Sequence, residues 1–267
     1  AVALWRPDLL IAPFLKRAIP ESVWRALPCW VVHPGIVGDR GPSALDWAVL
    51  EGETRWGVTV LQANAHFDAG DVLATREFTM RAATKGSLYR LEVADAAVAA
   101  VLEALERHVA GEAPTPLSSW TPTPRSRARP VCRQADRAID WARDTTATVL
   151  AKIRSADGTP GLLDAAAAGP LKLHDAHAEG ALRGAPGAWI ACRDEALCRA
   201  TVDGAVWIGS LTRADDAEHP FKRPAALVLP ELAAQLPEAP LALDATPDMP
   251  TWRELAYTEA EGVGVLH

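Results

Sequence analysis

The stretch at residues 29–72 constrains the fold and the chemistry of this chain more than any other. It opens on an apolar run, continues into His33 and a Pro-Gly turn, and closes on a turn that contains Asp68. The pattern predicts a buried strand that ends on a histidine and a second strand that ends shortly before an aspartate. Strand ends gather at one edge of an open α/β sheet, so we expect His33 and Asp68 to face a shared crevice.

Apolar patterns in the first half predict alternating strands and helices, as in a Rossmann-like α/β domain. The expected strands cover 8–12, 29–32, 57–62 and 72–78, and the expected helices cover 20–26, 44–50 and 88–109. The apolar strand at 8–12 is typical of a parallel sheet that is covered on both faces. The chain opens on what looks like a helix end running directly into this strand, so we expect a first βα unit to be missing.

A proline-rich stretch separates two parts of the chain. We interpret residues 113–130 as an extended linker. The alternative is a crossover lying against a phosphate or an acidic surface, because this stretch carries Arg125, Arg127 and Arg129 and no acidic residue between 114 and 130. The first domain is therefore expected at 1–112.

The second half predicts one helix at 136–155, followed by short strands. These strands are expected at 171–173, 188–191, 199–202 and 205–208, with glycines between them. Several short strands behind one helix are typical of a small antiparallel, OB-like barrel. We place this domain at 131–230 and a tail at 231–267, in which only 231–235 is expected to form a helical turn.

Composition limits the classes of function. The net charge of −7 and the lack of a long basic run argue against nucleic acid as a ligand. No apolar run approaches the roughly 20 residues that span a bilayer, so we expect a cytoplasmic protein without a membrane partner. The four cysteines form no CxxC pair and predict reduced thiols. His174 and His177 have no convincing third ligand nearby, so no metal site is expected.

Several ordered motifs carry a family resemblance. They are His33-Pro34-Gly35, Arg40-Gly41-Pro42, Asp46-Trp47-Ala48, residues 57–60, 68–71 and 86–89, and in the second half residues 138–141 and 153–161. Together they resemble 10-formyltetrahydrofolate-dependent formyltransferases, a family that includes methionyl-tRNA formyltransferase. Within this family, the sequence at 33–48 is most similar to hydrogenase maturation factors of the HypX (HoxX) type. Those proteins join a formyltransferase-like half to an enoyl-CoA-hydratase-like half, which would follow the tail at 231–267.

The resemblance implies roles for particular residues. His33 and Asp68 become the catalytic pair, with protonated His33 stabilising the oxyanion and Asp68 orienting the ring and helping to remove a proton. Contacts to the co-substrate are expected at Arg40, Val58, Gly70 and Asp71. Arg40 has an equally weighted alternative, a surface ion pair with Asp39 or Asp46.

One position departs from the family pattern. Formyltransferases usually carry Asn two residues before the histidine as a second oxyanion donor, and here that residue is Val31. Loss of one such donor typically costs roughly 100- to 1000-fold in rate. The departure weakens an amine-formylating function more than a thiol-formylating one.

The resulting hypothesis is an enzyme that transfers the formyl group of 10-formyltetrahydrofolate to coenzyme A. By resemblance, this is the first step of carbon monoxide synthesis for NiFe-hydrogenase, with small-molecule substrates and hydrogenase maturation proteins as partners. The rivals are an amine formyltransferase acting on methionyl-tRNA or a nucleotide-linked amino sugar, and a non-catalytic module that binds folate or coenzyme A.

Overall fold

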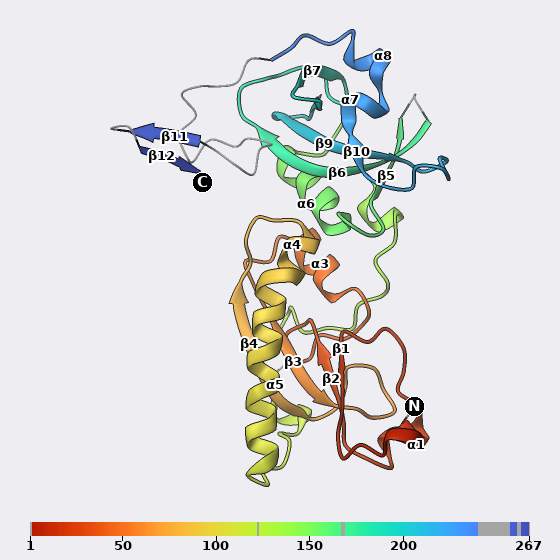
Figure 1. Ribbon diagram of the computed structural model, residues 1–267, viewed down its shortest axis with the longest axis vertical. Coiled ribbons are helices and arrows are strands. Elements are labelled where there is room, and N and C mark those ends of the chain that lie inside the picture. The colour runs from red at the N-terminus through yellow and green to blue at the C-terminus, as the bar shows by residue number, and fades with distance from the viewer. Residues whose placement is uncertain (1, 122, 167–168, 240–256, 261–262, 267) are drawn as a thin grey trace. The chain divides into compact units, whose positions relative to one another are not determined.

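The chain divides into two compact units, each with its own sheet (Figure 1). The computed structural model describes residues 2–121, 123–166, 169–239, 257–260 and 263–266. The first unit spans residues 1–132 and the second spans 133–267. None of the helices in the described ranges has both the length and the apolar character needed to cross a membrane.

The first unit is built on a four-stranded mixed sheet with the order β1-β2-β3-β4. β1 and β2 are parallel, whereas β3 is antiparallel to both β2 and β4. The all-parallel arrangement expected for the strand at 8–12 therefore holds for one pair only. The strands are β1 (Leu10–Pro13), β2 (Cys29–His33), β3 (Arg55–Gln62) and β4 (Val72–Thr79).

Helix α5 (Ala94–Val109) lies along this sheet in Figure 1 and contacts β3 and β4. Its buried side includes Ala96, Ala100 and Ala104, and these small side chains let the helix approach the strands closely. The helix expected at 88–109 is interrupted: α4 (Lys85–Leu88) leads into one π-helical turn at Tyr89–Val93 before α5 begins. The other helices of this unit are α1 (Val2–Trp5), α2 (Glu21–Trp24) and α3 (Ala44–Leu50).

Residues 113–130 are extended, as predicted, but they belong to the first unit. Thr115 forms a bridge with Val72, and Ala128 forms one with Arg40. Apart from a 3₁₀ turn at Leu117–Ser119, the segment has no helix. The three arginines that the sequence singled out lie against acidic side chains of the same unit, Glu51, Glu53 and Asp39. The segment is thus docked on an acidic surface, which is the alternative that the sequence left open.

The second unit contains an antiparallel sheet with the order β5-β6-β9-β8-β7, and β10 pairs with β9. The predicted strands are all present, whereas β5 and the two-residue β10 were not predicted. Within the described ranges β5 and β7 do not pair, so the closed OB-like barrel is not observed there. The strands are β5 (Leu162–Ala166), β6 (Gly169–Glu179), β7 (Trp189–Arg193), β8 (Ala196–Ala200), β9 (Ala205–Arg213) and β10 (Arg223–Pro224).

Helix α6 (Thr146–Ala156) packs on β6, but it starts ten residues later than the sequence predicted. The side chain of Thr145 accepts a hydrogen bond from the Thr148 N–H and caps the helix there. The preceding part holds a 3₁₀ turn at Ala135–Arg137 and an Asp140 turn, so the apolar residues in it pack without helical backbone. Helix α7 (Ala225–Val228) precedes the tail, and α8 (Pro230–Ala233) leads into it. The tail also holds the hairpin of β11 (Tyr257–Ala260) and β12 (Val263–Leu266), and its other residues from 240 onward lie outside the described ranges.

Asp157 follows α6 and is a buried anchor of the second unit. One oxygen pairs with Lys222, and the other accepts the Asp175 N–H at 2.8 Å. Burial by itself would raise the pKa of Asp157, but hydrogen bonds from His174, Lys222 and the Asp175 backbone outweigh it and hold the pKa well below the usual 3.8.

We therefore expect Asp157→Asn to lower the free energy of unfolding of the second unit by about 1–3 kcal/mol near neutral pH. A lowered folded-state pKa stabilises the protein above the unfolded value and loses that contribution as pH falls through the folded value. The difference between wild type and variant should therefore shrink as the pH drops below 3.8. Urea unfolding followed across this pH range checks the prediction, and a difference that is constant with pH would contradict it.

Candidate active site

His33 ends β2 and lies between two carboxylates. Its Nε2 is 3.1 Å from Asp39 Oδ2, and its Nδ1 is 3.4 Å from Asp68 Oδ1. The ring is only 3% exposed. The structure therefore brings together the two residues that the sequence paired, and adds a third group on the opposite side of the imidazole.

Asp68 reaches His33 by a route different from the one expected. β3 runs antiparallel to β2, and Gln62 at its end pairs with Trp30, so β3 ends far from His33 along the sheet. The loop at 63–70 returns toward His33 instead. Gly70 makes this path possible, because a Cβ there would lie 1.6 Å from the Gln62 carbonyl oxygen.

Two local features hold Asp68 in place. Its backbone has φ of 51°, a left-handed conformation that aspartate tolerates better than most residues. Its Oδ2 accepts the Gly41 N–H at 3.1 Å. The other oxygen, Oδ1, remains directed at His33, so the carboxylate is oriented by the backbone of the His33–Gly41 loop.

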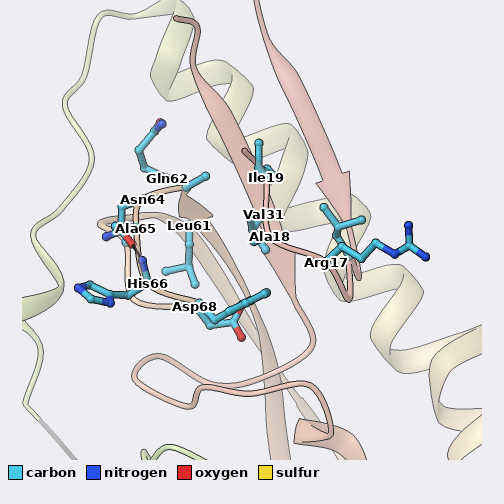
Figure 2. Close-up of a pocket in the computed structure, with 14 residues that line it drawn as sticks. Arg17, Ala18, Ile19, Val31, Leu61, Gln62, Asn64, Ala65, His66 and Asp68 are labelled. Atoms are coloured by element: carbon cyan, nitrogen blue, oxygen red, sulfur yellow. Dashed lines mark hydrogen bonds between the residues drawn. The ribbon is translucent and has the colours of Figure 1, made fainter. Parts of the chain in front are cut away.

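A hollow of about 500 Å³, part of it open to solvent, lies beside Asp68. Figure 2 shows its walls, which come from the segment after β1, from β2 and from the loop after β3. Asp68 lines the hollow, whereas His33 is not among the lining residues and contacts Asp68. The lining residues are Leu15, Arg17–Ile19, Val31, Leu61–Asp68 and Gly70.

The position of the usual asparagine donor is part of this hollow. Val31 lines it and shares a strand face with His33, because the two residues are two positions apart on β2. No neighbouring amide takes over. The Asn64 amide donates to the Ala69 carbonyl, and in Figure 2 the Gln62 side chain extends away from Asp68. The wall at Val31 is therefore apolar.

Asp39 is a site residue that the sequence did not identify, since it entered only as a surface partner for Arg40. Its side chain is completely buried, and Oδ1 accepts a hydrogen bond from Arg129 Nε at 2.7 Å. The one feature of the sequence that could have identified Asp39 as a site residue is its position, six residues after His33 in a Gly-rich turn. Asp39 and Arg129 are 90 residues apart, so the sequence did not indicate that they pair.

The four expected co-substrate contacts fall in different places. Gly70 lines the hollow. Arg40 is exposed, and its backbone pairs with residues 127–129. Asp71 is also exposed, with Oδ1 accepting the Leu117 N–H. Val58 is fully buried in the core of the first unit, so its side chain does not reach a ligand in the hollow.

The histidines considered as metal ligands have other partners. His174 lies 3.5 Å from Asp157, and His177 lies 3.0 Å from Asp175. Among the described residues, no group of three His, Cys, Asp or Glu side chains is arranged to hold a metal ion. Both histidines lie on β6, each beside a carboxylate.

Comparisons with known proteins show to which family the chain belongs. Residues 1–105 match the model described as formyl transferase, and residues 132–223 match the model for the formyl transferase C-terminal domain. The hydrogenase maturation factor HoxX of Bradyrhizobium diazoefficiens is 57% identical over 241 residues, which are 90% of this chain and 42% of that protein. A methionyl-tRNA formyltransferase of Roseiflexus castenholzii is 30% identical, over 74% of this chain and 64% of that enzyme.

Among solved structures, HypX from Aquifex aeolicus in complex with tetrahydrofolic acid is 43% identical with a TM-score of 0.88. The match covers 100% of this chain and 46% of that one. The chain thus spans a little under half the length of the HoxX and HypX relatives. With a buried His33–Asp68 pair beside a hollow and both domain models matched in order, the chain belongs to the formyl transferase family and, within it, is similar to the hydrogenase maturation factors HoxX and HypX.

Proposed function

We propose that this chain transfers the formyl group of 10-formyltetrahydrofolate to the thiol of coenzyme A, as the formyltransferase part of a HypX-type maturation protein. The observation that carries the proposal is Asp68, which lines the hollow while His33 Nδ1 lies 3.4 Å from its Oδ1. A carboxylate and an imidazole in contact beside a cavity form an acid–base pair suited to group transfer. The formyl-CoA product would be the precursor of the carbon monoxide ligand of NiFe-hydrogenase.

The lining of the hollow suits the proposed donor in character. Apolar side chains at Leu15, Ile19 and Leu61 offer a surface for a flat ring, and the backbone of the loop at 63–70 offers polar groups for its edge. The HypX relative with bound tetrahydrofolic acid supports a folate donor. Arg40 is exposed, and we propose that it contacts a folate carboxylate or a coenzyme A phosphate.

The reaction needs one proton removed and one negative charge stabilised. A thiol has a pKa near roughly 8.5 and is mostly protonated at neutral pH, so a base assists its attack. Asp68 is placed to take this proton. The sulfur–carbon bond forms, the bond from the formyl carbon to nitrogen breaks, and the proton passes to the departing nitrogen.

Stabilisation of charge on the formyl oxygen is assigned to His33. Nε2 is occupied by Asp39, so in the protonated ring Nδ1 is the nitrogen that can donate to the formyl oxygen. The 3.4 Å contact of Nδ1 with Asp68 is longer than an ordinary hydrogen bond, so Nδ1 can donate to a substrate oxygen without losing a tight bond to Asp68. Val31 is apolar and supplies no second donor from the position of the usual asparagine, which favours the more nucleophilic thiol over an amine as acceptor.

The test uses the full-length protein with 10-formyltetrahydrofolate and either coenzyme A or an amine acceptor. We expect release of tetrahydrofolate together with formyl-CoA, and a loss of about 100-fold or more in His33→Ala. A formylated amine as the main product would favour the amine rival. Tight folate binding without turnover, or a rate unchanged in His33→Ala, would overturn the catalytic assignment.

A further inference from the structure

Asp39 is a buried carboxylate with both oxygens engaged. Oδ2 lies 3.1 Å from His33 Nε2, and Oδ1 lies 2.7 Å from Arg129 Nε. The side chain has no exposed surface. A buried carboxylate is costly unless its charge is balanced and its oxygens are hydrogen-bonded, and both conditions are met here by one cation and one imidazole.

Arg129 is an equally buried cation, with 2% of its side chain exposed. Its Nη1 lies 2.6 Å from Glu51 Oε2, and the guanidinium lies 5.5 Å from the centre of the Trp56 ring. Burial by itself would lower the pKa of Arg129, but the hydrogen bonds and charges of Glu51 and Asp39 outweigh it and raise the pKa. Arg129 therefore keeps its proton, and Nε always donates to Asp39.

This arrangement decides which nitrogen of His33 carries a proton. An ionised carboxylate only accepts hydrogen bonds, and two carboxylates flank the ring. Asp39 is the nearer one, at 3.1 Å against 3.4 Å for Asp68, so in the neutral ring the nitrogen facing Asp39 carries the hydrogen. That nitrogen is Nε2. Gly35 leaves room for the contact, because a Cβ there would lie 2.3 Å from His33 Nε2 and 2.8 Å from Asp39 Oδ2.

We propose that Asp39, fixed by Arg129, is the positioning residue for His33. It holds Nε2 protonated and turns Nδ1 toward Asp68, so that Nδ1 is the nitrogen that gains and loses a proton during transfer. The inference rests on the proposed function for its kinetic consequence. Its structural content, the Nε2–H form of neutral His33, is independent of which acceptor is used.

Asp39→Asn gives a directional test. Arg129 Nε is a donor and needs an acceptor, so the amide oxygen of the new side chain faces Arg129 and its NH₂ faces His33. Nε2 must then accept, and the proton of the neutral ring moves to Nδ1. A carboxylate-to-amide change of this kind leaves geometry nearly intact while it reverses the tautomer.

The readout is the ¹⁵N spectrum of the histidine rings in the full-length protein, recorded at increasing pH until the chemical shifts stop changing. His33 is assigned by its absence in His33→Gln. We expect Nε2–H in the wild type and Nδ1–H in Asp39→Asn. In the same variant kcat should fall by about 100-fold while the affinity for tetrahydrofolate stays within about threefold.

Arg127→Gln serves as the matched control, because Arg127 also pairs with Glu51 but is 53% exposed and does not touch Asp39. It should keep both the tautomer and kcat of the wild type. Nδ1–H in the wild type would overturn the proposal whether or not Asp39→Asn folds. If Asp39→Asn reversed the tautomer but left kcat unchanged, the role of Asp39 in catalysis would be overturned and its effect on the tautomer would stand. If the wild type showed Nε2–H but no formyl transfer, the result would count against the proposed function and leave the positioning of His33 by Asp39 intact.

Discussion

Replacing Asp68 by asparagine should lower kcat for formyl transfer by about 1,000- to 10,000-fold. An amide cannot accept the proton of the attacking group, and general acid–base catalysis contributes up to this amount. The geometry should survive, because the amide oxygen can still accept the Gly41 N–H that now binds Oδ2. The amide NH₂ would then face His33 Nδ1 and occupy the nitrogen that is needed for the substrate.

The measurement is kcat and KM of full-length enzyme with 10-formyltetrahydrofolate and coenzyme A, with tetrahydrofolate affinity measured separately. Asp95→Asn makes the same chemical change on the exposed side of α5 and should leave all three values unchanged. If Asp68→Asn retained kcat within about threefold, Asp68 would not be the base. If folate affinity fell as far as kcat, its role would be binding.

The second large effect is expected on stability. Arg129→Met should lower the free energy of unfolding of the first unit by about 3–5 kcal/mol, because it leaves the buried charge of Asp39 without its cation. The side chains are close in length, so little packing is lost. Native-state hydrogen exchange at the slowest amides of β2 reports this free energy.

Two further variants show whether the unpaired charge of Asp39 causes the loss of stability in Arg129→Met. Arg127→Met removes an exposed ion pair to the same Glu51 and should cost only about 0–1 kcal/mol. Adding Asp39→Asn to Arg129→Met removes the charge and should recover most of the lost stability. Equal losses in Arg127→Met and Arg129→Met, or no recovery in the double variant, would show that the pair contributes through packing.

Much of the local structure follows from short-range patterns. The strands at 29–32, 57–62 and 72–78 agree with β2, β3 and β4 to within two residues, because their apolar runs leave few alternatives. The helix at 136–155 was wrong over its first ten residues. Apolar spacing there resembles a helix, but the capping contact of Thr145 begins it at Thr146.

The site likewise combines features that follow from the sequence with features that depend on tertiary structure. The sequence by itself determined that His33 ends a buried strand and that Asp68 lies in a turn, since each is a property of a few neighbouring residues. The family resemblance identified Val31 as the residue that replaces the usual amide. Only the tertiary structure decided how they meet. β3 turned out antiparallel, so Asp68 reaches His33 through the folded-back loop at 63–70 and not through a shared sheet edge.

The third partner also came from tertiary structure alone. Asp39 and Arg129 are separated by 90 residues and look like surface charges in the sequence. They pair because each would be costly to bury alone, and docking of the segment 113–130 buries both at once. Strand direction, loop path and long-range charge pairing all depend on packing across the whole unit, which no local pattern encodes.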